Sequence, residues 1–126
     1  MGRKIGLTSS AVQQQLGVAQ PDFGVLFDDM DTTSRAVPMS RLLQPKAEAE
    51  IAFVLGEDLS IASAHVALEI VDSRISACDI SFGDPLRPGQ VVLSGALGPM
   101  TAVGAGDVVE TTISGVTLTA RFPEDA

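Results

Sequence analysis

Two glutamates two positions apart, Glu48 and Glu50, are the sharpest chemical signal in the sequence. They open an apolar segment that is expected to be a β-strand, and residues i and i+2 of a strand point to the same face. Two carboxylates held side by side repel each other, and a divalent cation that prefers carboxylate oxygen, such as Mg²⁺, relieves this repulsion. The alternative is a solvated strand edge with two surface glutamates. The motif taken alone favours that alternative, because Glu-x-Glu is common.

A third glutamate, Glu69, lies among apolar residues at positions 66–71. A carboxylate in such surroundings needs a partner. The partner is either a metal ion or a cation in an ion pair, for which Arg74 and Lys4 are the candidates. Three carboxylates that leave coordination positions open for water and substrate suit Mg²⁺ or Mn²⁺. From the spacing alone, the two interpretations stand about equal.

Lys4 and Asp22 are the remaining candidates for acid–base chemistry. Lys4 is either an exposed strand residue, which is the commoner case, or a residue that points into a pocket. In a pocket, burial would disfavour its charged form and lower its pKa. Asp22 either caps a turn or reaches a pocket as an acid or base. His65 has no Ser or Cys partner indicated by spacing and is expected at the surface or at a junction between elements. Cys78 has no neighbouring base to activate its thiol. Neither His65 nor Cys78 is therefore expected to be catalytic.

The elements that must position these side chains are mainly β-strands. Segments in which apolar residues cluster indicate strands, at residues 3–8, 47–55, 61–75 and 90–95. Two further segments, 108–114 and 116–122, alternate and are rich in β-branched residues, which predicts a hairpin with Gly115 at its bend. The length of 126 residues suits a single domain, residues 1–126, of mainly β structure with minor α.

Helix and loop signals are few. A short helix is expected at residues 11–16, and a turn or loop is expected at residues 20–24. Gly95, Ala96 and Leu97 lie in a glycine-bearing loop after a strand. That loop is either a tight turn or a backbone wall close to a ligand.

The composition excludes several classes of function. The net charge is −8, which argues against nucleic acid and anionic lipid as partners, because both require clustered Lys and Arg. Hydrophobic residues make up 45% of the chain, so it can form a packed core. A single cysteine and the absence of a long apolar run indicate a cytoplasmic protein in a reducing compartment.

Five blocks of the sequence carry a family resemblance. The blocks are GRKIGLTS, AVQQQLGVAQPDFG, LQPKAEAEIAFVL, ALEIVDSRI and SGALGPMTAVGAGD. In this order they resemble the 2-hydroxypenta-2,4-dienoate hydratases of the fumarylacetoacetate hydrolase superfamily, and they cover well over half of the chain. The 4-oxalocrotonate decarboxylases are close relatives, but QQQLGVAQPDFG and GALGPM look more like the hydratase branch.

The resemblance implies a rolled, mixed β-sheet of the fumarylacetoacetate hydrolase C-terminal-domain type, with a pocket at its mouth. It implies that Glu48, Glu50 and Glu69 hold a divalent metal, Mg²⁺ or Mn²⁺. It also implies that Lys4 and Asp22 line the active site.

The implied activity is the hydration of 2-hydroxypenta-2,4-dienoate to 4-hydroxy-2-oxopentanoate in the meta-cleavage of aromatic compounds. Leu16 is expected near this small-molecule substrate. A homo-oligomer is expected, with association with a related decarboxylase as a further option. Two other functions stay open: decarboxylation of a 2-oxo-dienedioate such as 4-oxalocrotonate, and a non-catalytic fragment or partner subunit.

The chain departs from the family in length. Members carry a helical N-terminal region before GRKIGLT and a long segment between DSRI and PLRPG, where this chain has only residues 76–83. The chain either carries a deletion or joins segments of a longer protein. A real deletion would remove one wall of the pocket.

Overall fold

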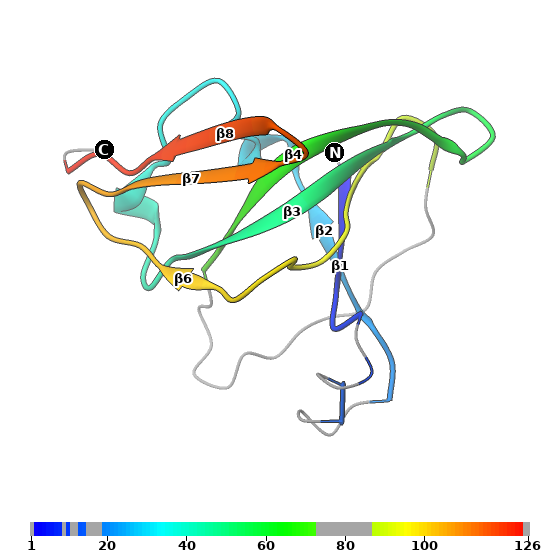
Figure 1. The fold of residues 1–126 in the computed structure, drawn as a ribbon, viewed down its shortest axis with the longest axis horizontal. Coiled ribbons are helices and arrows are strands. Elements are labelled where there is room, and N and C mark those ends of the chain that lie inside the picture. Colours follow the sequence, from blue (N-terminus) through cyan, green and yellow to red (C-terminus); the bar gives the residue numbers. More distant parts are fainter. Residues whose placement is uncertain (1, 9, 11–12, 15–18, 73–86, 125–126) are drawn as a thin grey trace. The chain divides into compact units, whose positions relative to one another are not determined.

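The computed structural model describes residues 2–8, 10, 13–14, 19–72 and 87–124 (Figure 1). The described elements are strands and two single-turn 3₁₀ helices, which confirms the expected mainly β character. In chain order they are β1 (Gly2–Gly6), β2 (Asp22–Leu26), η1 (Asp28–Met30), η2 (Met39–Arg41), β3 (Lys46–Leu55), β4 (Ile61–Val71), β5 (Val91–Leu93), β6 (Thr101–Ala102), β7 (Val108–Ile113) and β8 (Val116–Arg121). Within these residues no helix has the length and apolar character needed to cross a membrane.

The expected strands match β1, β3, β4, β5 and the β7–β8 hairpin. The expected turn or loop at residues 20–24 is confirmed at residues 20–21 and wrong at residues 22–24, because β2 begins at Asp22 and pairs along its length with β1. Tertiary pairing overrides the local turn signal here. The expected helix at residues 11–16 and the end of the expected strand 61–75 lie largely outside the described residues.

Five strands follow the order β2-β1-β5-β3-β4 in one sheet, and β6 pairs with β3 beside this path. β1 is antiparallel to β2 and parallel to β5, and β3 is antiparallel to both β5 and β6. The sheet is therefore mixed, as expected. β7 and β8 form a separate antiparallel pair.

The chain divides into two compact units. β3 and β4 are each divided between them, with one part of the strand in unit 1 and the other part in unit 2. Unit 1 takes the described residues of Met1–Asp28, Ile51–His65 and Asp79–Gly95. Unit 2 takes those of Asp29–Glu50, Val66–Cys78 and Ala96–Ala126.

Unit 1 is built on the β1–β2 ladder, in which Lys4 lies opposite Gly24 and Gly6 opposite Asp22. Directly opposite residues of an antiparallel pair point to the same face, as do residues i and i+2 of one strand. Lys4, Gly6, Asp22 and Gly24 therefore share one face of this ladder.

Unit 2 has a hydrophobic core centred on Phe122, which at 1% exposure is the largest fully buried side chain among the described residues. Val37, Ala47 and Val103 complete the buried cluster, and Ile70 packs against it. The hairpin next to Phe122 in sequence, β7–β8, appears in orange and red in Figure 1.

The turn of this hairpin has the backbone that the sequence indicates. Ser114 and Gly115 have φ angles of 51° and 80°. Two consecutive positive φ angles are typical of the two-residue turn whose twist matches that of its flanking strands. The prediction of a hairpin with Gly115 at its bend is confirmed.

Candidate active site

Three carboxylates converge in unit 2. Glu48 and Glu50 on β3 and Glu69 on β4 each place one carboxylate oxygen so that all three oxygens lie within 4.8 Å of one another. Glu50 is 1% exposed and Glu69 is 9% exposed. The triad expected from the sequence is therefore brought together, and two of its members are withdrawn from water.

The alternation of β3 and β4 explains this convergence. Ala47 on β3 and Ile70 on β4 face the hydrophobic core around Phe122. The neighbouring residues along each strand must point to the opposite face, which places Glu48 and Glu69 together on the side away from this core. The apolar residues thus fix the direction of the charged ones.

The electrostatics of the triad favour a cation. Two ionised carboxylates about 4.8 Å apart repel by about 3.5 kcal/mol at an effective dielectric constant of about 20. Opposed oxygen ligands are about 4.2 Å apart around Mg²⁺ and about 4.8 Å apart around Ca²⁺, from metal–oxygen distances of about 2.1 and 2.4 Å. All three oxygens lie within 4.8 Å of one another, which is no farther apart than two ligands of one such ion can be. The residues present therefore fit a divalent metal.

Asp72, just beyond the end of β4, joins the two strands that carry the triad. Its carboxylate accepts hydrogen bonds from the backbone N–H of Leu43, at 3.0 and 3.1 Å, and of Gln44, at 2.8 Å. Those two residues lead into β3. Asp72 thereby ties the start of β3 to the end of β4. Sequence reasoning missed this residue, although a carboxylate within the family block ALEIVDSRI was available as a signal.

The loop after β5 runs along β3. In unit 1, the Ser94 Oγ accepts a hydrogen bond from the Ile51 N–H at 3.1 Å, and the Ser94 N–H donates to the Ile51 carbonyl at 3.0 Å. In unit 2, the Leu97 N–H donates to the carbonyl of Ala49 at 2.9 Å. Leu97 therefore lies beside β3 at Ala49, the residue between Glu48 and Glu50. Ala96, which precedes Leu97, is exposed.

Gly95 brings the backbone of this loop close to β1. Its φ angle is 91°, and a Cβ atom at this position would lie 2.8 Å from the Ile5 carbonyl oxygen. Both features require glycine. The element that Gly95 approaches is β1, and the expected backbone wall close to a ligand stays a prediction.

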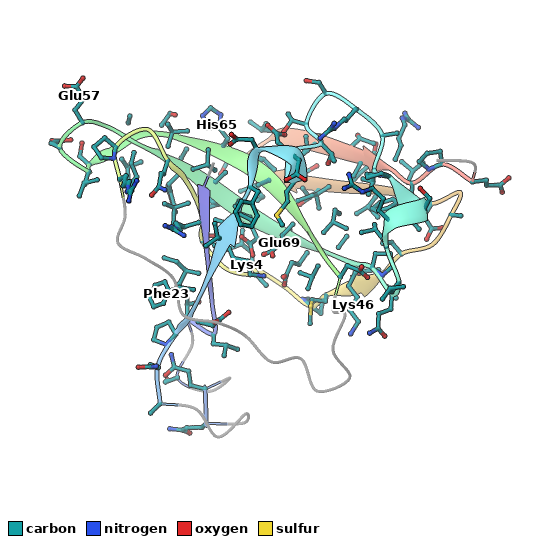
Figure 2. All side chains as sticks on the ribbon, turned by 180° about the vertical axis from the view of Figure 1, so that it is seen from behind. Lys4, Phe23, Lys46, Glu57, His65 and Glu69 are labelled. Carbon is teal, nitrogen blue, oxygen red and sulfur yellow. The ribbon has the colours of Figure 1, made fainter. Side chains whose placement is uncertain are left out.

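Lys4 and Asp22 lie on one face of unit 1. Figure 2 shows Lys4 on β1, and Asp22 belongs to the adjacent strand β2. They are diagonal neighbours in the ladder, a relation that long side chains can span. Asp22 is 5% exposed and Lys4 is half-buried, so neither is a freely exposed strand residue.

Three residues that the sequence analysis considered remain to be placed: Leu16, Cys78 and His65. Leu16 and Cys78 lie outside the described residues. His65 is exposed on β4, as expected, but the expectation that it has no serine partner is wrong. The Ser63 Oγ lies 2.9 Å from His65 Nε2, because residues two apart on a strand share a face.

Curated relatives of the chain are hydratases. The chain is 37% identical to 2-keto-4-pentenoate hydratase from Paraburkholderia xenovorans, over 92% of this chain and 73% of that protein. It is 36% identical to the TodF product hydratase from Pseudomonas putida, over 97% of this chain and 76% of that protein. The first alignment extends over 196 residues, although 92% of 126 residues is only about 116. About 80 aligned positions therefore have no counterpart in this chain.

Solved structures share the fold. The 4-oxalocrotonate decarboxylase from Pseudomonas putida G7, complexed with calcium and acetate, matches with a TM-score of 0.84 and 20% identity over 96% of this chain and 76% of that chain. No family model matches the sequence. The fold is thus that of the decarboxylase, while sequence identity points to the hydratases. The chain belongs to the family of the 2-keto-4-pentenoate hydratases, which are hydro-lyases.

Proposed function

We propose that this chain is a metal-dependent hydratase that converts 2-hydroxypenta-2,4-dienoate into 4-hydroxy-2-oxopentanoate, a reaction of the meta-cleavage of aromatic compounds. The observation that carries the proposal is the convergence of Glu48, Glu50 and Glu69 within 4.8 Å in a member of the hydratase family. The fold is assigned to the fumarylacetoacetate hydrolase C-terminal-domain type, in keeping with its mixed sheet and its structural neighbour.

The three glutamates are the proposed metal ligands. A divalent metal bound there supplies positive charge for the carboxylate and the 2-oxygen of a 2-oxo or 2-hydroxy acid. Solved structures of the decarboxylase are complexed with calcium or magnesium, which supports a divalent ion. Oxygen-only ligation suits Mg²⁺ or Mn²⁺, and we propose one of these as the physiological ion.

The reaction requires two proton movements and one water. The 2-hydroxyl group loses a proton and C5 gains one, which converts the dienol into a conjugated ketone. Water then adds its hydroxyl group at C4 and a proton at C3, which gives the 4-hydroxy-2-oxo acid. Each stage requires a group that accepts a proton and a group that donates one.

Lys4 and Asp22 are the proposed groups for these proton transfers. They share one face of the β1–β2 ladder, and both are withdrawn from bulk water. A lysine and an aspartate on one face provide two groups that can each accept or donate a proton. The backbone loop with Gly95, Ala96 and Leu97 is the proposed substrate wall, and Leu16 stays a further predicted contact. We also propose that the chain acts as a homo-oligomer, which light scattering measures directly.

The test compares two substrates. The purified protein with Mg²⁺ is incubated with 2-hydroxypenta-2,4-dienoate or with 4-oxalocrotonate, and the products are identified by NMR together with measurement of CO₂. We expect 4-hydroxy-2-oxopentanoate from the first substrate, and its loss in the Lys4→Met and Asp22→Asn variants. Release of CO₂ from 4-oxalocrotonate without hydration would establish a decarboxylase instead. Turnover of neither substrate would establish a non-catalytic chain.

A further inference from the structure

The side chain of Lys4 lies directly over Gly24. The two residues are paired in the β1–β2 ladder. A Cβ atom built on Gly24 would lie 2.7 Å from the Lys4 Cγ, 3.1 Å from its Cδ and 3.5 Å from its Cε. The aliphatic stem of the lysine therefore occupies the space in which any other residue at position 24 would place its side chain.

The backbone does not explain the glycine. Gly24 is absent from the glycines with positive φ among the described residues, which are Gly89, Gly95, Gly106 and Gly115. Its extended conformation is open to every residue type, and glycine in a strand interior lowers stability by roughly 0.5–1 kcal/mol relative to alanine. A strand glycine without a conformational need commonly marks the close approach of another group. Here that group is the stem of Lys4.

A second glycine on the same face provides the contrast. Gly6 lies opposite Asp22, and a Cβ atom on Gly6 would lie 3.8 Å from the Asp22 Oδ2. That distance is an ordinary van der Waals contact. The close contact with a lysine stem is therefore a feature of position 24 and is not shared by Gly6.

We propose that Gly24 is a positioning residue that sets the course of the Lys4 side chain and thereby the place of its amine. The inference rests on the proposed function of Lys4 in proton transfer. A side chain at position 24 displaces the stem from its Cγ outward, because a contact of 2.7 Å must be relieved and the Cγ lies near the root of the lysine, not at its flexible end. The amine moves with the stem, and a displacement of about 1 Å in a reacting group can lower the rate about 100-fold.

The first experiment measures Lys4 itself. Competitive labelling with acetic anhydride across a range of pH, read by mass spectrometry, gives the reactivity of each lysine in the wild type, Gly24→Ala and Gly6→Ala. We expect the labelling profile of Lys4 to change in Gly24→Ala and to stay as in the wild type in Gly6→Ala. Lys46, which is exposed, is the internal reference. An unchanged profile in Gly24→Ala, or an equal change in both variants, would overturn the proposal.

The second experiment is a double-mutant cycle on hydration. Gly24→Ala should lower kcat about 10-fold to 100-fold with little change in KM. In the Lys4→Ala background the displaced atoms are gone, so the same substitution should have no further effect on the rate. The double variant should also fold at least as stably as Lys4→Ala, which keeps the test valid if Gly24→Ala alone folds poorly. Equal losses of rate in both backgrounds would contradict a role through Lys4.

The two experiments separate two kinds of failure. If Lys4→Ala keeps the full rate of hydration, the proposed role of Lys4 in proton transfer is wrong. The labelling of Lys4 still reports whether Gly24 positions it. If the labelling of Lys4 is insensitive to position 24 while Lys4→Ala is inactive, the proposed function stands and the positioning role of Gly24 fails.

Discussion

Replacement of Asp72 by alanine should weaken both the fold and the binding of metal. The carboxylate accepts hydrogen bonds from the backbone N–H groups of Leu43 and Gln44, at distances of 2.8–3.1 Å. A hydrogen bond to an ionised group contributes roughly 1.5–3 kcal/mol, and the lower end of this range applies where solvent reaches the bond. Loss of the bonds to both amides should therefore lower the free energy of unfolding by about 2–3 kcal/mol. Asp72 ties the residues before β3 to the end of β4, so its loss should loosen the two strands that carry the ligands. The affinity for Mg²⁺ should therefore also fall, by about 10-fold, the lower end of the loss seen when a partner of a metal ligand is removed.

The assay combines urea denaturation of the metal-free protein with calorimetric titration of Mg²⁺. Asp107→Ala is the matched control, because the Asp107 Oδ2 also accepts from a backbone N–H in unit 2, that of Gly104 at 2.8 Å. Asp107 lies at the turn before β7, away from the strands of the triad in sequence. The Asp107→Ala variant should have a free energy of unfolding about 1 kcal/mol lower than the wild type and an unchanged affinity for Mg²⁺. Wild-type affinity in Asp72→Ala, or equal loss of affinity in both variants, would refute the reasoning.

Two further predictions concern stability. Phe122→Ala should destabilise by about 3–5 kcal/mol in urea denaturation, since this side chain is 1% exposed at the centre of the core of unit 2, whereas Phe27→Ala, at 52% exposure, should change stability by less than about 1 kcal/mol. Equal effects would contradict the assigned core. Hydrogen bonds from the Thr33 side chain and backbone hold the pKa of Asp31 below its usual value of 3.8. The stabilisation is therefore present above the unfolded pKa and is lost as the pH falls through the folded pKa. Asp31→Asn should be less stable than the wild type at neutral pH, and the difference should disappear on acidification; a difference constant with pH would exclude this origin.

The local pattern of the sequence was sufficient for most strands and for the side of β3 to which Glu48 and Glu50 point. Alternation along β3 sets Ala47 toward the core and Glu48 and Glu50 away from it, and this alternation is visible in the sequence. An apolar setting also marked Glu69 as a carboxylate in need of a partner. Convergence of the three residues is a property of strand order, which local pattern does not contain, and the family resemblance provided it.

Features that depend on long-range pairing were not predictable from local signals. Asp22 follows a proline and has the appearance of a turn residue, but pairing with β1 extends β2 to include it. The partners of Asp72 lie 28 and 29 residues earlier in the chain. The need for glycine at position 24 follows only from the register that places it opposite Lys4.

The most direct test of the account is the titration of Mg²⁺ into the metal-free wild type, Glu50→Gln and Glu57→Gln. Glu57 is exposed and lies outside the triad. The wild type and Glu57→Gln should bind one Mg²⁺ per chain, and the ion should stabilise them by about 2.7 kcal/mol at a concentration 100 times the Kd. Glu50→Gln should keep the fold and lose this binding and the accompanying stabilisation. Binding of Mg²⁺ by Glu50→Gln with wild-type affinity would contradict the assignment of the three glutamates as the metal site.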